Sequence, residues 1–245
     1  MEEDYYRHMA DIQARHWWYE GRRRILESMI CRLNLPASAS ILEVGCGTGA
    51  NLPMLQKFGA VAGVEPHEWA RRHAAGISGC DVRDGMLPGK IPFSGSYDLA
   101  CAFDVIEHVD QDLESLRALY RLTKPGGHAL FTVPAWRFLW SQHDVINHHK
   151  RRYSLDEFRS LLKQAGFSIE FISYYNFWLF PVVALVRIIK NAMKIDGRPD
   201  MTRPGNPLIN ALLARIFASE RFLLNSCRLP FGVSIVALCR KETSS

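Results

Sequence analysis

The chain has 245 residues, 48% of them hydrophobic, which is enough for one α/β domain with a substantial core. Its 30 basic and 25 acidic residues give a net charge of +5, too small an excess to indicate a nucleic-acid partner. The six cysteines form no C-x-x-C pair, which argues against a zinc ribbon or a redox motif. The acidic start of the chain, Met1–Asp4, does not resemble a signal peptide, so we expect a cytoplasmic protein.

Residues 1–37 predict a helical cap that ends in a Pro- and Ser-containing loop. The cap contains Trp17 and Trp18, followed by the arginine triplet Arg22–Arg24. Two interpretations remain open and are compatible. The tryptophans close over a bound ligand, which makes them candidate substrate-binding residues, or they anchor the cap to the rest of the domain.

A glycine-rich turn follows the first predicted strand. The apolar run 41–44 is typical of a buried parallel strand, and Gly45, Gly47 and Gly49 follow it at every second position. Such glycines permit positive φ and let a ligand approach the backbone, and open α/β sheets bind nucleotide-like ligands at turns of this kind. Glu43 stands at the buried end of the strand, where a carboxylate needs a partner that a cationic ligand would supply.

Strands and helices alternate along the rest of the chain. We expect strands at 60–66, 80–83, 97–105, 128–133, 167–175 and 234–241. We expect helices at 51–58, 67–75, 110–122 with Asp110 as N-cap, and 155–165 with a capping box at Ser154–Glu157. This alternation predicts an α/β fold with a doubly wound, mostly parallel sheet.

Four motifs appear in a fixed order along this pattern. They are E-x-G-x-G-x-G at 43–49, Val64–Pro66, Phe103–Val109 and Leu122–Gly127. Together they resemble the class I S-adenosylmethionine-dependent methyltransferases, of the small-molecule, ubiquinone-biosynthesis-like type, over about residues 38–175. The glycine spacing differs from the G-x-G-x-x-G of dinucleotide dehydrogenases, which disfavours a nicotinamide oxidoreductase.

The resemblance implies a seven-stranded Rossmann-like sheet with an N-terminal helix and a helical insertion between the last two strands. It also implies S-adenosyl-L-methionine as the cofactor. We expect a single domain in four parts. These are the helical cap (1–37), a cofactor-binding core (38–176), a helical lid or insertion (177–230), and the last strand and tail (231–245).

The resemblance further implies which residues hold the cofactor. The glycine turn would pass beneath its amino acid portion, and Glu43 would support the turn and the cationic amino group. Glu65, sixteen residues after the turn, would accept hydrogen bonds from the ribose diol, and residues 103–104 would lie beside the methionyl part. The adenine contact falls within 81–86, where the register is ambiguous, and we place it at Asp84–Met86. The implied set is Glu43, Gly45, Gly47, Gly49, Glu65, Asp84, Gly85, Met86, Phe103 and Asp104.

A dense polar cluster at 140–153 follows the fifth long strand, on the side where doubly wound sheets bind ligands. His143 or His148 is a candidate general base for an acceptor hydroxyl, with Asp144 fixing the tautomer. A metal site at His143, Asp144 and His148 is disfavoured because no cysteine or further carboxylate stands at ligand spacing, so we expect no metal.

The same cluster ends in Arg151, Arg152 and Tyr153. These residue types suit a clamp for a substrate carboxylate or phosphate, so all three are candidate substrate-binding residues. The alternative is structural. Buried polar bonds within the cluster would then pin its loop to the N-terminal helix.

The insertion at 177–230 replaces the short hairpin that usually joins the last two strands of this family. Its apolar first part is too short to span a membrane. It is either a buried lid helix, which we prefer, or a peripheral membrane contact through 177–195. In the second case, basic residues would face the headgroups, namely Lys190, Lys194, Arg198 and Arg203. After a joint at 201–207, residues 208–224 repeat at helical spacing and either cover the pocket or form a homodimer.

The sequence thus predicts a methyltransferase that acts on a small-molecule or lipid-linked acceptor, with oxygen as the methylated atom. An apolar lid beside an Arg/Tyr cluster suits an acceptor with hydrophobic and anionic parts, such as a quinone precursor, an isoprenoid or a lipid-linked sugar. No nucleic acid is expected, and the location would be cytoplasmic, at the inner face of the membrane in the peripheral case. The alternative is a catalytically inactive cofactor-binding scaffold of the same fold.

Overall fold

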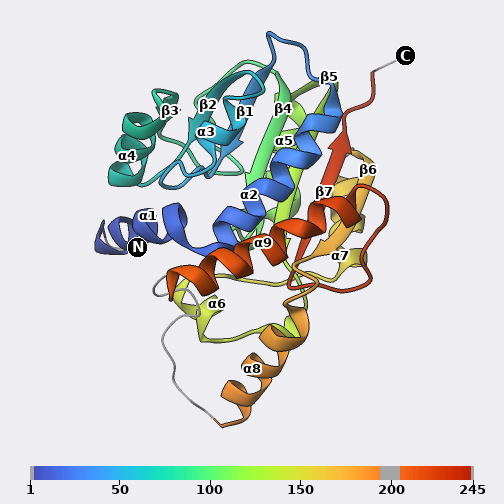
Figure 1. Cartoon of the computed structure of the whole chain (residues 1–245). Helices are drawn as coiled ribbons and strands as arrows, with labels where there is room; N and C mark the ends of the chain where they lie inside the picture. Colours follow the sequence, from blue (N-terminus) through green and yellow to red (C-terminus); the bar gives the residue numbers. More distant parts are fainter. Residues whose placement is uncertain (1–2, 194–204, 244–245) are drawn as a thin grey trace.

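The computed structural model describes residues 3–193 and 205–243, which build a seven-stranded sheet between two layers of helices (Figure 1). The strand order is β3-β2-β1-β4-β5-β7-β6. Strands β1 to β5 run parallel, and β7 is antiparallel to both β5 and β6. The strands are β1 (Ser40–Val44), β2 (Ala60–Val64), β3 (Asp81–Arg83), β4 (Tyr97–Phe103), β5 (Thr123–Pro134), β6 (Ser168–Tyr175) and β7 (Ser234–Arg240). The mostly parallel, seven-stranded sheet predicted from the sequence is confirmed.

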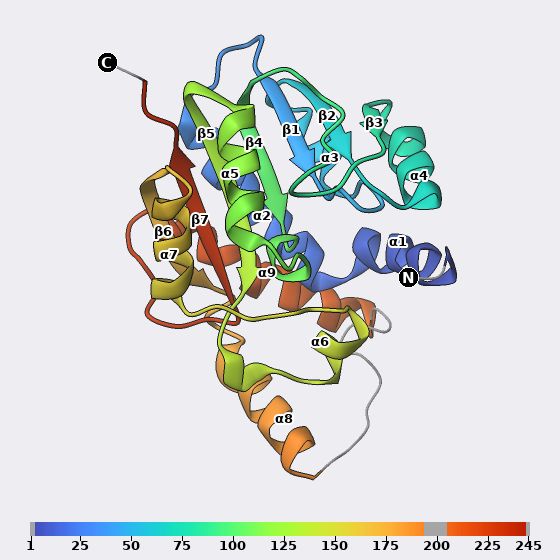
Figure 2. The same ribbon diagram turned by 180° about the vertical axis from the view of Figure 1, so that it is seen from behind.

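The helices cover both faces of this sheet. They are α1 (Glu3–Arg15), α2 (Trp17–Ile30), α3 (Leu52–Leu55), α4 (Glu68–Ser78), α5 (Asp112–Leu122), α6 (Gln142–Ile146), α7 (Leu155–Gln164), α8 (Phe180–Ala192) and α9 (Pro207–Leu224). Helices α2 and α9 lie on the face turned toward the viewer in Figure 1, and α5 lies on the opposite face, in front in Figure 2. The layers are therefore those of a doubly wound fold.

Neighbouring residues on one strand face opposite layers. On β1, Ile41 packs in the cluster that contains α2, whereas Leu42 packs in the cluster that contains α5 and α7. Both side chains have no exposed surface. A strand buried on both faces reads as a continuous apolar run, which is why the sequence identified it.

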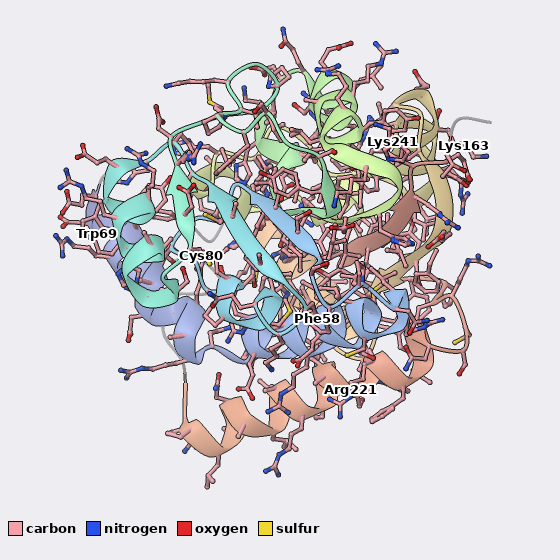
Figure 3. The ribbon with its side chains drawn as sticks, turned by 90° about the horizontal axis from the view of Figure 1, so that it is seen from above. Phe58, Trp69, Cys80, Lys163, Arg221 and Lys241 are labelled. Carbon is pink, nitrogen blue, oxygen red and sulfur yellow. The ribbon has the colours of Figure 1, made fainter. Side chains whose placement is uncertain are left out.

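Helix α9 packs along α2, and its Phe217 ring also stacks on Tyr175 at the end of β6. Figure 3 shows Arg221 on this outermost helix. Gly21 permits this close approach, because a Cβ there would lie 2.5 Å from the ring of Phe217. The two halves of the insertion therefore differ. Helix α9 forms a second layer over the N-terminal cap, while α8 lies beyond the carboxyl ends of the parallel strands.

Three local predictions need correction or extension. The N-terminal cap is two helices rather than one, and His16 separates them, with Nδ1 accepting a hydrogen bond from the Trp18 amide. The predicted cap Asp110 is wrong, because Gln111 precedes α5 and makes no side-chain cap bond. The helix after the glycine turn spans only Leu52–Leu55. The capping box at Ser154–Glu157 is confirmed.

Within the described residues, no helix combines the length and the apolar character needed to cross a bilayer. The predicted basic residues Lys194, Arg198 and Arg203 and the first part of the 201–207 joint lie outside the described residues. Helix α8 itself is confirmed as a helix, and it begins with Phe180 and Pro181.

Candidate functional site

A cavity of about 1050 Å³ opens at the carboxyl ends of β1, β2 and β4, between the N-terminal helices, the loop after β5 and α8. Open α/β sheets bind their ligands at this end of the strands. The sequence-predicted residues that line the cavity are Trp17, Trp18, Gly45, Gly47, Glu65, Gly85, Met86, Phe103, Asp104, His143, His148 and Arg152.

Five predicted residues are not among those that line the cavity. Glu43 lies in β1, and Gly49 is the last glycine of the turn, where a Cβ would lie 2.7 Å from Ala74. Asp84 forms an ion pair with Lys90 on the surface. Arg151 and Tyr153 both bond to one carboxylate oxygen of Asp112, at 2.6 and 3.1 Å.

The glycines of the turn differ in what surrounds them. Gly45 has a φ of +73°, and a Cβ there would lie 2.5 Å from the Val105 side chain. Gly47 has a φ of +56°, yet a Cβ there would meet nothing within 4 Å. The turn therefore packs tightly at Gly45 and is open at Gly47, which lines the cavity.

Glu65 is held beside that space by the backbone. One carboxylate oxygen accepts the Gly47 amide at 2.9 Å, and the other accepts the His67 amide at 2.9 Å. Burial raises the pKa of Glu65, while the two backbone hydrogen bonds oppose the rise. A carboxylate has further lone pairs, so Glu65 can accept from a ligand diol without losing these bonds.

Glu43 lies directly behind the turn and is 1% exposed. One of its oxygens accepts the Asn51 side-chain amide at 2.7 Å, and the other has no hydrogen-bond partner among the described residues. Burial raises the pKa of Glu43 to about 7, although the Asn51 bond opposes the shift. The cationic ligand expected for this oxygen stays a prediction, because Glu43 is not among the residues that line the cavity.

Arg22 is a site residue that sequence reasoning did not single out from its triplet. It is 5% exposed, pairs with Asp104 at the end of β4, and lies over the Trp18 ring with its Cζ 4.6 Å from the centroid. Trp18 thus both lines the cavity and stacks on the arginine that ties α2 to the sheet. The anchoring interpretation therefore applies to Trp18, and its contact with a bound ligand stays a prediction.

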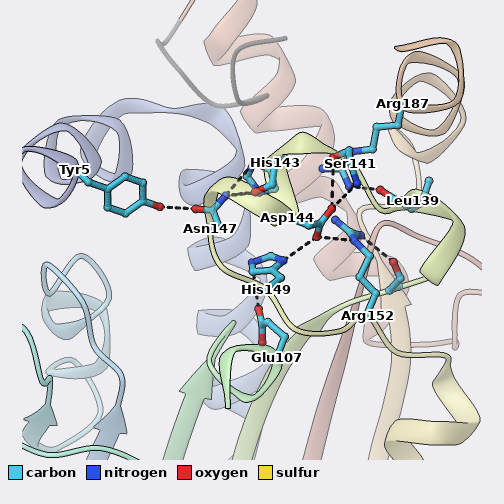
Figure 4. Close-up of polar contacts among 11 residues, drawn as sticks. Tyr5, Glu107, Leu139, Ser141, His143, Asp144, Asn147, His149, Arg152 and Arg187 are labelled. Carbon is cyan, nitrogen blue, oxygen red and sulfur yellow. Dashed lines mark hydrogen bonds and ion pairs between the residues drawn. The ribbon is translucent and has the colours of Figure 1, made fainter. Parts of the chain in front are cut away.

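Asp144 is the centre of a buried polar network on the other side of the cavity (Figure 4). Its Oδ1 accepts from His149 Nδ1 at 2.8 Å and from Arg152 Nε at 2.7 Å, and its Oδ2 accepts the Ser141 amide at 2.9 Å. Burial alone would raise the pKa of Asp144, but the bonds from His149 and Arg152 hold it well below its usual value. The network fixes the loop after β5.

The two predicted general bases lie in the same segment, His143 in α6 and His148 just after it. The Asn147 side-chain amide lies 3.3 Å from both ring nitrogens of His143, and Asn147 in turn accepts a hydrogen bond from Tyr5 on α1. His148 has a φ of +56°. The Tyr5 bond ties the loop to the N-terminal cap, as the structural interpretation of the cluster expected (Figure 4).

Sequence reasoning gave no role to Glu107, His108 and His149, although all three line the cavity. A signal was present for the first two, because they lie in the turn at 106–108 shortly after β4, whose end was already predicted as a cofactor contact. His149 was harder to find. Its position follows from Asp144, which selects it over the adjacent His148.

Comparisons with known proteins identify the family and the fold. A family model described as "Methyltransferase domain" matches residues 8–170. The chain is 32% identical over 138 residues to a ubiquinone biosynthesis O-methyltransferase of Vibrio campbellii, covering 50% of this chain and 59% of that protein. The ubiquinone biosynthesis O-methyltransferase of Escherichia coli O6:H1 is 30% identical over 136 residues, covering 49% of this chain and 57% of that protein. The chain thus spans less than two thirds of these curated relatives.

Solved structures share the fold at low sequence identity. The chain bound to the Trm112 methyltransferase activator in a Haloferax volcanii complex gives a TM-score of 0.64 at 14% identity, covering 99% of this chain and 96% of that chain. Phosphoethanolamine N-methyltransferase 2 of Haemonchus contortus, solved with S-adenosyl-L-methionine, gives 0.58 at 16% identity, covering 89% and 52%. Family and fold together indicate S-adenosylmethionine as the cofactor. The chain therefore belongs to the class I S-adenosylmethionine-dependent methyltransferases.

Proposed function

We propose that the protein transfers a methyl group from S-adenosylmethionine to an oxygen of a small-molecule or lipid-like acceptor. The observation that carries this proposal is the cavity of about 1050 Å³ with the Gly47–Glu65 cradle in its wall. Ligand pockets in proteins span about 300–1,000 Å³, so this volume accommodates a cofactor together with an acceptor. The resemblance to ubiquinone biosynthesis O-methyltransferases supports oxygen as the acceptor atom and a quinone precursor as the acceptor class.

The residues present fit the cofactor. Glu65 would accept the ribose hydroxyls, and the open space at Gly47 would receive the amino acid portion. Gly85 and Met86 would contact the adenine, with Asp84 held outward by Lys90. Phe103 and Asp104 would flank the methionyl part. Gly45 and Gly49 belong to the turn and would give it its shape, and Glu43 would support the turn from β1. When bound, the cofactor supplies a methyl group on a sulfonium, which an acceptor oxygen attacks in line.

The protein's contribution is to position the acceptor and to remove a proton. Trp17 and Trp18 offer aromatic surface to an apolar acceptor from α2. Arg152 lines the cavity, but its Nε donates to Asp144 and its Nη1 donates to the Ala135 carbonyl, so we propose that it holds the loop. We propose the same for Arg151 and Tyr153, which bond to Asp112.

An incubation with purified protein and labelled S-adenosylmethionine tests the proposed reaction. The acceptors are a panel of alkyl- and prenyl-substituted phenols, with matched amines and thiols. We expect mass spectrometry to find one added methyl group on a phenol. Methylation of the amines alone would contradict oxygen transfer. Calorimetric cofactor binding with no product on any acceptor would contradict the reaction itself.

We expect His143→Ala to lower turnover about 100-fold or more while leaving cofactor affinity unchanged, because loss of a general base removes about 10²–10⁴-fold in rate. His148→Ala is measured alongside, since both side chains line the cavity. His73→Ala on α4, whose ring stacks on Trp69, is the matched control. Turnover equal to that of the control in both cavity variants would remove histidine from the base role.

The outer face of α8 supports a peripheral membrane contact. Val182, Val183 and Val186 line the cavity, whereas Leu185, Ile188 and Ile189 are not among the lining residues and are 59%, 50% and 45% exposed. We propose that the lining valines make α8 a wall of the site. The helix is not the buried one that was preferred from the sequence, because Val182 and Val186 are themselves 62% and 41% exposed. We propose that the outer stripe lies on a membrane surface from which a lipid-like acceptor enters.

Leu185→Glu is expected to reduce cosedimentation with vesicles that contain anionic lipid, since it places a charge in the apolar stripe. Ile77→Glu on α4 carries the same charge change at an apolar side chain that is 50% exposed, and it is the control. Equal binding of both variants would contradict the membrane contact. A doubled mass in light scattering that Leu185→Glu abolishes would instead make this face of α8 a homodimer interface, a role that was predicted from the sequence only for residues 208–224.

A further inference from the structure

Three side chains on the cavity wall form a cluster that methyl transfer from a sulfonium does not require. Glu107 and His108 lie in the short 3-10 turn after β4, and His149 follows α6. One ligand atom from each lies within 4.8 Å of the others. Two chain segments thus bring a carboxylate and two imidazoles to one point, and Figure 4 shows Glu107 and His149 facing each other.

Glu107 is a buried carboxylate without hydrogen-bond partners among the described residues, as expected for a cation ligand. It is 0% exposed, and neither of its oxygens has a hydrogen-bond partner among the described residues. Its ion-pair contact is His149 Nε2, at 4.0 Å. Neighbouring carboxylates, in contrast, form ion pairs with arginines: Asp104 pairs with Arg22, and Asp144 pairs with Arg152. A buried carboxylate left in this state carries a desolvation cost that a bound cation would offset.

His149 is oriented as metal-binding histidines are. Its Nδ1 bonds to Asp144 Oδ1 at 2.8 Å, which leaves Nε2 directed toward Glu107. A carboxylate on the far nitrogen fixes the tautomer and raises the basicity of a metal-binding imidazole. Arg152 holds Asp144 in place at 2.7 Å, and the His108 ring lies edge-on to His149 with centroids 4.8 Å apart.

We propose that Glu107, His108 and His149 bind one divalent transition-metal ion, of which Zn²⁺ and Co²⁺ are representative. Two imidazoles and one carboxylate form a donor set that favours these ions over Mg²⁺ and Ca²⁺, which prefer oxygen ligands. Because metal–ligand bonds of about 2 Å bring ligand atoms closer than they lie here, the side chains close by roughly 1 Å on binding. The cavity leaves the remaining coordination positions to water or to an acceptor oxygen.

The test uses full-length, tag-free protein stripped of metal with a chelator. We expect one Co²⁺ per chain to give the visible absorption bands of a low-coordinate site, and Zn²⁺ to displace it. Glu107→Gln and His149→Ala should each weaken Zn²⁺ binding at least about 100-fold, because even the loss of an outer partner costs about 10–100-fold in metal affinity. His73→Ala is the control and should bind as the wild type does.

Several results would overturn the site. They are no Co²⁺ spectrum and no calorimetric Zn²⁺ binding by the wild type, wild-type affinity in both cluster variants, or an equal loss in the His73 control. Circular dichroism checks the fold, and the isosteric Glu107→Gln decides if His149→Ala does not fold. Calorimetry with S-adenosylmethionine runs in parallel. Cofactor binding without metal binding rejects the site and leaves the proposed function intact.

Discussion

Replacing Gly47 by valine is expected to weaken S-adenosylmethionine binding about 10- to 100-fold. The new side chain would enter the open space above the turn, where a Cβ meets no protein atom within 4 Å. Overpacking of a filled site costs about 1–3 kcal/mol, which converts to that range of affinity. Isothermal titration of the purified variant with the cofactor measures the change directly.

Backbone strain is the competing explanation, and the chain contains a matched control for it. Gly79, after α4, has a φ of +68° against +56° for Gly47, and a Cβ there also meets nothing within 4 Å. Gly79→Val therefore imposes a comparable left-handed backbone cost, about 1–2 kcal/mol, at a position that does not line the cavity. Both variants should lose similar thermal stability, and only Gly47→Val should lose cofactor affinity. Equal affinities would show that the space at Gly47 is not the cofactor site.

The features that the sequence predicted well are local in the chain. The strand, the turn and the Glu65 carboxylate follow one another within 41–65, and parallel pairing of β1 with β2 brings their ends together. Two glycines with different surroundings could not be told apart beforehand, because the atoms that crowd Gly45 belong to Val105 on a distant loop. Periodicity finds a strand, but it carries no information on what packs against its end.

The features that the sequence missed are pairs that only the fold brings together. Arg22 meets Asp104, and His149 faces Glu107, across many intervening residues. Three arginines in a row look alike in a sequence, and burial of α2 against the sheet decides which of them reaches the cavity. His148 and His149 likewise look alike in the sequence, and only the fold shows that His149 is the one that bonds to the Asp144 carboxylate.

Replacing one of two adjacent arginines in the 140–153 cluster, Arg151 and Arg152, is expected to change the thermal stability by very different amounts. Both Arg151 and Arg152 were expected to clamp an anionic substrate, yet the structure pairs each with a carboxylate of the protein. The Arg152–Asp144 pair is buried, with side chains 2% and 0% exposed, whereas the Arg151–Asp112 pair is 31% and 16% exposed. The free energy of each pair should follow from this difference in burial.

Arg152→Met is expected to lower Tm by roughly 10 °C. Removing one partner of a buried ion pair costs about 3–5 kcal/mol, because the Asp144 carboxylate stays buried with only its bonds from His149 and Ser141. A chain of this size loses about 2–4 °C per kcal/mol. Arg151→Met breaks a partly exposed pair worth about 1 kcal/mol or less, so its Tm should fall by only about 2–4 °C. Differential scanning calorimetry at neutral pH compares the two. Equal shifts would mean that Asp144 does not depend on Arg152, and a methyl-transfer defect in Arg152→Met without a loss of Tm would restore the substrate clamp.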